Sequence, residues 1–154
     1  YGRRQRQMCI RDRSTANTIA SMSPAALMPV GLSQRKAEYL IGIANEVTSG
    51  QLDFVALQHL PGDAVQARLI KIRGIGAWTA DNFRLFALGD MDAWPVNDLA
   101  LQEGMKRLKN LQERPTGKQM EQLGARWQPY RGAGALVLWH IYGILVKRAT
   151  IGDI

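Results

Sequence analysis

Apolar side chains recur three or four residues apart along most of the chain, which is the spacing of one face of a helix. The clearest case follows Ser33, a good N-cap residue, and ends before Gly50. No segment alternates at the period of two that half-buried strands show. The same pattern predicts further helices over residues 24–30, 63–72, 77–88, 98–108, 116–127 and 130–147, and a short helix or a turn over residues 52–60. The predicted fold class is therefore all-α, in a single domain.

Two of these helices carry specific expectations about burial. The helix after the loop at residues 89–95 is expected to open at Asn97 or Asp98, because both residue types cap helices well. Its spacing places Leu101, Met105 and Leu108 on the inner face. The last helix is rich in Ala, Leu and Val and is expected to be largely buried.

Positive charge is concentrated at the start of the sequence. The 154 residues have a formal charge of +7, which favours a polyanionic partner but is weak evidence alone. Residues 1–13 hold five arginines against one aspartate. They resemble the translated adapter sequence found at the ends of reading frames from metagenomic assemblies, so we assign them no function. The alternative is a native basic arm for DNA.

Two kinds of protein are not expected from this composition. The longest apolar run, residues 133–146, is interrupted by Gly134, His140 and Gly143, so no membrane span is expected. The only cysteine is Cys9, which leaves no disulfide and no cysteine-ligated zinc or iron–sulfur site. A reducing compartment is consistent with that.

A glycine-rich turn, Arg73-Gly74-Ile75-Gly76, separates two of the predicted helices. Glycine permits positive φ and close backbone approach, and the helix that follows presents unpaired N–H groups to an anion such as a DNA phosphate. The alternative is a tight helix–helix turn with no ligand. The predicted phosphate-binding residues are Gly74, Ile75, Gly76 and Thr79. A Na⁺ or K⁺ ion bridging to the same phosphate is predicted on the backbone carbonyls of Ile70, Ile72 and Ile75.

Three sequence blocks, taken with their order and separation, resemble the helix-hairpin-helix DNA glycosylase superfamily, specifically its 3-methyladenine DNA glycosylase II branch. The blocks are residues 30–40, residues 73–80 with the later Pro95 and Asp98-Leu99, and residues 126–131. The resemblance extends from about Ser23 to Tyr142. It implies a partial helix-hairpin-helix glycosylase domain over residues 14–154, expected to be N-terminally incomplete because the family has additional helices before Ala16.

The resemblance also implies the site residues. The family's catalytic aspartate falls on Asp98, where a fixed anion would stabilise the oxocarbenium charge that develops on the sugar. The alternative is an ordinary helix cap. Trp78 stands where bifunctional members place a Schiff-base lysine, which implies a monofunctional hydrolase. Trp78 and Trp139 are expected to stack on the extruded base, the alternative being core packing, and Trp94 and Trp127 are assigned to packing.

The sequence departs from the family pattern at several positions. Asn82 is polar where the family often has a bulky residue, and Arg73 stands where many relatives have proline. His59 and His140 match no catalytic position. Three basic side chains are alternatively phosphate contacts or surface charge: Arg35, Lys36 and Arg131.

The predicted function is hydrolysis of the N-glycosidic bond of alkylated purines such as 3-methyladenine in base excision repair. The expected partner is double-stranded DNA with alkylated bases, in the bacterial cytoplasm at the nucleoid, with no redox cofactor or divalent metal required. Mismatched or oxidised bases are alternative substrates, although the missing lysine and cysteine cluster argue against the lyase and iron–sulfur branches. A non-catalytic DNA-binding module, or an inactive fragment, is the alternative outside enzymes.

Overall fold

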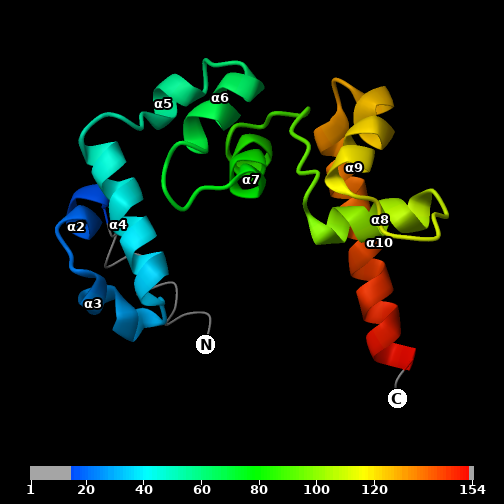
Figure 1. The fold of residues 1–154 in the computed structure, drawn as a ribbon, viewed down its shortest axis with the longest axis horizontal. Helices are drawn as coiled ribbons and strands as arrows, with labels where there is room; N and C mark the ends of the chain where they lie inside the picture. Colours follow the sequence, from blue (N-terminus) through cyan, green and yellow to red (C-terminus); the bar gives the residue numbers. More distant parts are fainter. Residues whose placement is uncertain (1–14, 153–154) are drawn as a thin grey trace, which may run out of the picture. The chain divides into compact units, whose positions relative to one another are not determined.

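The structure is a computed structural model that describes the backbone of residues 15–152 and the side chains of residues 15–145. Within this range every regular element is a helix, which confirms the all-α prediction (Figure 1). The basic leader at residues 1–13, with Cys9, lies outside the described residues. The described chain divides into two compact units: residues up to His59 with Ile72–Gly74, and Leu60–Lys71 with the residues from Ile75 onward.

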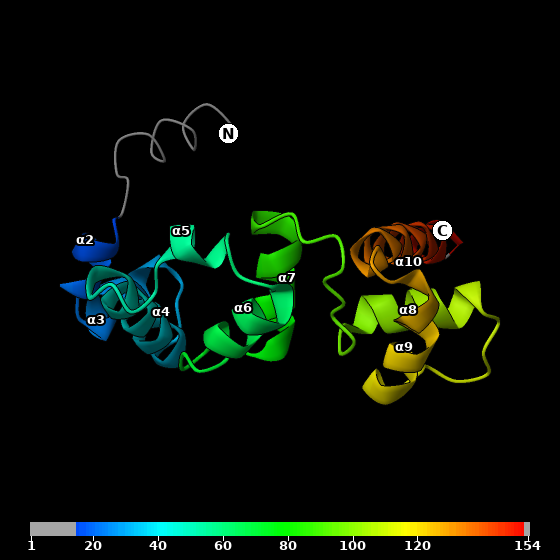
Figure 2. The same ribbon diagram turned by 90° about the horizontal axis from the view of Figure 1, so that it is seen from above.

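In the first unit, two short helices pack against one long helix, as Figures 1 and 2 both show. The long helix begins where the side chain of Ser33 accepts a hydrogen bond from the backbone N–H of Lys36, and Gly50 follows its end at φ 75°. Leu27 and Ala37 are buried in this unit. Its elements are α2 (Ala16–Ala20), α3 (Pro24–Leu27), η1 (Met28–Val30), α4 (Gln34–Thr48) and α5 (Phe54–Leu57).

The second unit holds two packed groups of helices. In one group α6 (Gly62–Leu69) pairs with α7 (Ala77–Ala87). In the other, α8 packs against α9 and α10 (Figure 2). The elements of this second group are α8 (Leu99–Leu108), α9 (Gly117–Gly124), η2 (Ala125–Trp127) and α10 (Arg131–Gly152).

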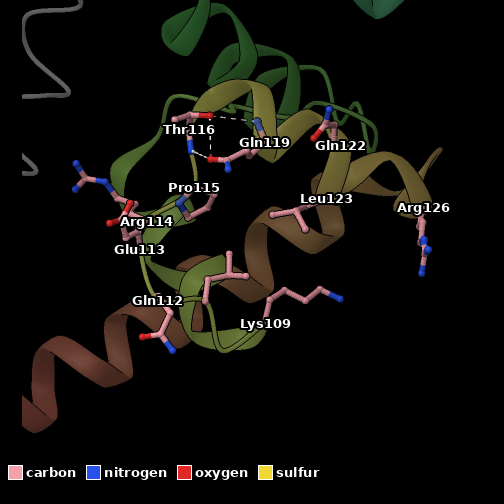
Figure 3. Close-up of a pocket in the computed structure, with 11 residues that line it drawn as sticks. Lys109, Gln112, Glu113, Arg114, Pro115, Thr116, Gln119, Gln122, Leu123 and Arg126 are labelled. Carbon is pink, nitrogen blue, oxygen red and sulfur yellow. Dashed lines mark hydrogen bonds between the residues drawn. The ribbon is translucent and has the colours of Figure 1, made fainter.

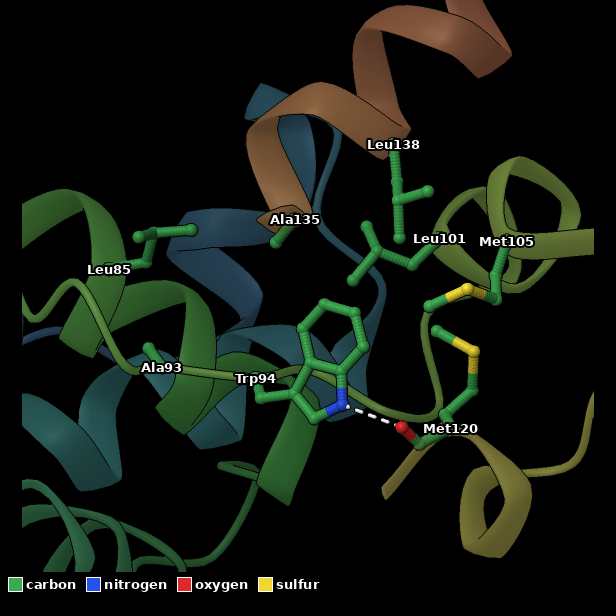
Figure 4. Packing of buried hydrophobic residues seen from close by; sticks show 8 residues of the cluster. All are labelled: Leu85, Ala93, Trp94, Leu101, Met105, Met120, Ala135 and Leu138. Carbon is green, nitrogen blue, oxygen red and sulfur yellow. Dashed lines mark hydrogen bonds between the residues drawn. The ribbon is translucent and has the colours of Figure 1, made fainter. Parts of the chain in front are cut away.

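A buried hydrophobic cluster joins the end of α7 to α8, α9 and α10 (Figure 4). Trp94 lies in it, donates its indole N–H to the carbonyl of Met120 at 3.0 Å, and meets the ring of Trp127 edge-on. Both tryptophans therefore pack, as the sequence predicts. The cluster consists of Leu85, Ala93, Trp94, Leu101, Met105, Met120, Ala135 and Leu138.

Helices α8 and α10 approach closely because α8 has a glycine at the contact. Gly104 lies against the backbone carbonyl of Leu138, and a Cβ atom there would collide with it. Leu138 is the residue directly before Trp139. The crossing of these two helices therefore sets where the indole of Trp139 can lie.

Three expectations about helix faces and ends are wrong. Leu108 is 48% exposed because it lies at the last turn of α8, beyond the cluster. Helix α6 ends at Leu69 rather than residue 72, because the chain turns into the hairpin earlier. Helix α10 is not largely buried: Leu136 and Val137 are exposed, since α8 and η2 cover only one side of it. No helix in the described part of the chain has the length and apolarity of a bilayer span.

Candidate active site

The carboxylate of Asp98 lies at the first turn of α8, with three hydrogen-bond donors around it. Its Oδ1 accepts the backbone N–H of Leu101 at 2.9 Å and the indole N–H of Trp139 at 3.1 Å. Its Oδ2 accepts the indole N–H of Trp78 at 2.6 Å. The residue is only 8% exposed. Asp98 is thus a helix cap and also the point where two distant tryptophans meet, so the structure brings together the three residues that the sequence predicted at one site.

An aromatic residue that sequence reasoning missed also belongs to this group. The ring of Phe86 stacks on the indole of Trp139 with ring centres 5.6 Å apart and an interplanar angle of 28°. Phe86 is 64% exposed and Trp78 is 51% exposed. Both rings therefore present apolar surface to solvent beside a largely buried carboxylate, which is the surface that a flat heterocycle would cover.

The α7 helix explains why these side chains gather. Trp78, Asn82 and Phe86 follow one another at intervals of four residues, so they share one face of α7. The amide of Asn82 turns back to donate to the carbonyl of Trp78 at 2.7 Å. Phe86 could have been identified from the sequence, because it lies four residues after Asn82 on the same face of the helix as Trp78.

The predicted phosphate-binding turn connects α6 to α7. Gly74 has φ 96° and lies directly over the ring of Tyr39, so a side chain is excluded there for two reasons. Gly76 is the N-cap of α7 with an extended backbone, and nothing lies near the position of a Cβ, so only one of the two glycines needs positive φ. Gly76 and Thr79 are exposed, and Ile75 is half-buried.

Helices α6 and α7 are held together by a buried polar network. Asp81 accepts hydrogen bonds from the amide of Gln66 at 2.7 Å and from Arg84 at 3.1 Å, and Arg84 also pairs with Asp90 at 2.7 Å. Burial raises the pKa of Asp81 to about 6, against the opposing effect of the Arg84 charge. Gly62 leaves room for this network, because a Cβ there would meet Arg84 and Asp90. Hydrophobic spacing along the chain does not predict this cluster.

The remaining candidates are an arginine in an ion pair and several exposed side chains. Arg131 binds Asp92 with two hydrogen bonds of 2.8 and 2.7 Å. These bonds lower the pKa of Asp92 and raise that of Arg131. Arg131 therefore fits a structural ion pair better than a phosphate contact. His59 and His140 are exposed, as are Arg35 and Lys36. No group of three or more metal-binding side chains occurs among the described residues.

A separate hollow of about 900 Å³ lies between the loop after α8 and the exposed side of α9 (Figure 3). Lys109, Arg114 and Arg126 line it with the amide side chains of Gln112 and Gln122. Arg114 is paired with Glu103 at 3.6 Å. None of the predicted site residues lines this hollow, so it is distinct from the Asp98 group.

Comparison with known proteins identifies the family. The model of the HhH-GPD superfamily of base excision DNA repair proteins matches residues 6–129. The chain belongs to that superfamily. It is 32% identical over 123 residues to a DNA-3-methyladenine glycosylase of Bacillus subtilis, an alignment that covers 80% of the chain and 41% of the relative.

Two solved structures resemble the chain. A DNA-3-methyladenine glycosidase from Bacillus halodurans has a TM-score of 0.75 and 36% identity, over 86% of this chain and 61% of that one. A 3-methyladenine DNA glycosylase from Schizosaccharomyces pombe in complex with abasic DNA has a TM-score of 0.76 and 30% identity, over 81% of this chain and 61% of that one. The chain thus spans about two fifths of the Bacillus subtilis relative and about three fifths of the two proteins of solved structure.

Proposed function

We propose that this HhH-GPD chain carries the catalytic centre of a monofunctional DNA N-glycosylase that hydrolyses the glycosidic bond of alkylated purines such as 3-methyladenine. The observation that carries the proposal is the Asp98 carboxylate, 8% exposed and bonded by the indoles of Trp78 and Trp139. The names of the relatives support the substrate class.

The chemistry follows from the charge that the reaction creates. Breaking the bond between base and sugar leaves positive charge on the sugar, and a carboxylate fixed in a poorly hydrated place stabilises it. Asp98 would supply that negative charge and orient the attacking water. Trp78, on the first turn of α7, has no amine with which to form a Schiff base, so hydrolysis without strand cleavage is expected.

The proposal includes the DNA partner. The hairpin residues Gly74 to Gly76, with Thr79 on the next turn, would hold a phosphate of a duplex that contains an alkylated base. A monovalent cation on the backbone carbonyls of Ile70, Ile72 and Ile75 would bridge to the same phosphate, since neutral oxygen donors suit Na⁺ or K⁺. No redox cofactor or divalent metal is required. The proposed location is the bacterial cytoplasm, at the nucleoid.

The principal test is release of bases from methylated duplex DNA, by the chain and by its Asp98→Asn variant. Asparagine caps a helix as well as aspartate, so the variant keeps the start of α8 but lacks the negative charge. We expect the rate to fall by about 10²–10³-fold. The matched control is Asp53→Asn, since Asp53 caps α5 through the N–H groups of Val55 and Ala56. No base release by the unaltered chain would reject the proposal.

A second measurement separates an enzyme from a DNA-binding module. Affinity for duplex DNA that contains an abasic site is measured for the same two variants. If the chain is an enzyme, Asp98→Asn abolishes excision but keeps most of the affinity for DNA. If it is a silent module, the unaltered chain and the variant bind DNA equally well and neither excises a base. Replacing K⁺ by a bulky organic cation at constant ionic strength tests the hairpin ion, since only a specific site responds.

A further inference from the structure

We propose that Trp78 and Trp139 are positioning residues for Asp98: their indole N–H groups hold the carboxylate for reaction, and Phe86 fixes Trp139. We call these two tryptophans the indole pair. The inference deepens the proposed function and rests on it. It differs from base stacking, which uses the ring faces of the indoles and not their N–H groups.

The hydrogen bonds leave the carboxylate with one free position. Two carboxylate oxygens together accept about four hydrogen bonds. Leu101 and Trp139 donate to Oδ1, and Trp78 donates to Oδ2. The remaining acceptor position is therefore on Oδ2, where a water molecule or the sugar can meet the charge. A carboxylate with three fixed donors cannot rotate without breaking hydrogen bonds. The unused acceptor site on Oδ2 therefore points in one direction.

The donors that hold Asp98 are all electrically neutral. Among the described residues, no lysine, arginine or histidine forms an ion pair with Asp98. A guanidinium would orient the carboxylate equally well but would neutralise the negative charge that a sugar cation needs. An indole N–H orients the group and leaves the net charge in place. This is a physical reason for two tryptophans rather than an arginine at this site.

Phe86 restricts the orientation of one member of the indole pair. Its ring stacks on Trp139, which is half-buried, while Phe86 itself is largely exposed. An exposed phenyl ring adds little to the core, so its contact is with the indole that bonds Oδ1. We infer that the stack holds the plane of Trp139 at the angle from which its N–H reaches Asp98.

The test replaces each tryptophan by β-(3-benzothienyl)alanine. This amino acid keeps the fused two-ring shape of the side chain but has sulfur in place of the indole N–H. At Trp78 or Trp139 we expect kcat on methylated DNA to fall about 10-fold or more with KM unchanged, because a hydrogen bond to a charged group is lost. The same replacement at Trp127, which packs edge-on against Trp94, is the matched control and should change neither constant. A rise in KM with unchanged kcat, or no change at all, would overturn the positioning role.

A second readout does not depend on activity. The indole N–H signals of Trp78 and Trp139 in ¹H–¹⁵N spectra should both move in Asp98→Ala, while that of Trp94 stays. Phe86→Leu should move the Trp139 signal alone. Phe86→Tyr, which keeps the stacked ring, should leave the Trp139 signal where it is in the unaltered chain. Unmoved signals would overturn the inference. Absence of excision by the unaltered chain would reject the proposed function, whereas excision with normal kcat in both benzothienyl variants would reject the role of the indole pair alone.

Discussion

Two buried carboxylates in the second unit are held in opposite ways. Asp81 on α7 bonds to Arg84, so a full positive charge lies beside it, and Arg84 is shared with Asp90. Among the described residues, the groups that bond Asp98 at the start of α8 are neutral N–H groups. The first arrangement neutralises the carboxylate within α7 and bonds it to α6 through the amide of Gln66. In the proposed function, the second offers its charge to the substrate.

This difference separates stability from activity. Removing the guanidinium from a buried carboxylate strongly destabilises the fold, and a carboxylate so paired has little charge left to offer a substrate. A carboxylate held by indoles keeps that charge, at the cost of burying it without a counter-ion. Variants in the Asp81 network should therefore change the free energy of unfolding, and variants at Asp98 should mainly change excision.

The largest effect on stability is expected from Arg84→Met. The change leaves Asp81 and Asp90 without their cation, and breaking a buried ion pair from one side costs about 3–5 kcal/mol. Urea unfolding at pH 7 measures it. Arg126→Met, an exposed arginine on η2, is the control and should stay within about 0.5 kcal/mol of the unaltered chain. A similar small loss in Arg84→Met would show that the network does not hold the two helices together.

The pH dependence of stability should identify Asp81 next. Its pKa is raised from 3.8 to about 6 in the folded chain, so the folded state holds a proton that the unfolded state has released across that interval. The unaltered chain should therefore lose stability relative to Asp81→Asn as the pH rises from about 4 to about 6. Above that interval the difference between their free energies of unfolding should stay constant. The measurement is urea unfolding of both proteins from about pH 3.5 to about pH 7, a range that includes both pKa values of Asp81. A difference that does not change with pH would contradict the raised pKa.

At Asp98 the expected loss of stability is smaller. Asp98→Ala removes the cap of α8 and should lower the free energy of unfolding by about 1–2 kcal/mol. Asp98→Asn keeps the cap but turns its NH₂ group toward the Trp78 N–H, so it should lose about 1 kcal/mol with that hydrogen bond. The same urea series gives both values. If Asp98→Asn proved as destabilising as Arg84→Met, the contrast between the two carboxylates would fail.

The smallest change is expected for Phe86→Leu. The ring is mostly exposed, so its loss should cost about 0.5–1 kcal/mol, chiefly from the stack on Trp139. Thermal unfolding with a Phe86→Tyr control, which keeps the stack, measures this. A loss above about 3 kcal/mol would instead place Phe86 in the core.

The features that the sequence could predict depend on neighbours within a few residues. Ser33 and Thr116 cap their helices with bonds to the third residue beyond, and Asp98 does the same for α8. Gly74 takes the positive φ that the hairpin was expected to need. Such local bonds follow from residue type and spacing alone.

The features that it could not predict depend on packing between distant parts of the chain. The bonds to Asp98 come from tryptophans 20 and 41 residues away, and spacing cannot show which edge of an indole faces a carboxylate. Asp81 and Arg84 look like an ordinary exposed i, i+3 pair until α6 covers them. Composition alone also could not show that Leu136 and Val137 lie on an uncovered side of α10.

The absent side chain of Gly104 has a consequence at the other end of its helix. Backbone contact at this point fixes the distance between the axes of α8 and α10, and Asp98 and Trp139 each belong to one of those helices. Adding a single methyl group at residue 104 would push the helices apart and draw the Trp139 N–H away from its acceptor. The geometry around Asp98 is therefore tied to a glycine that lies further along α8.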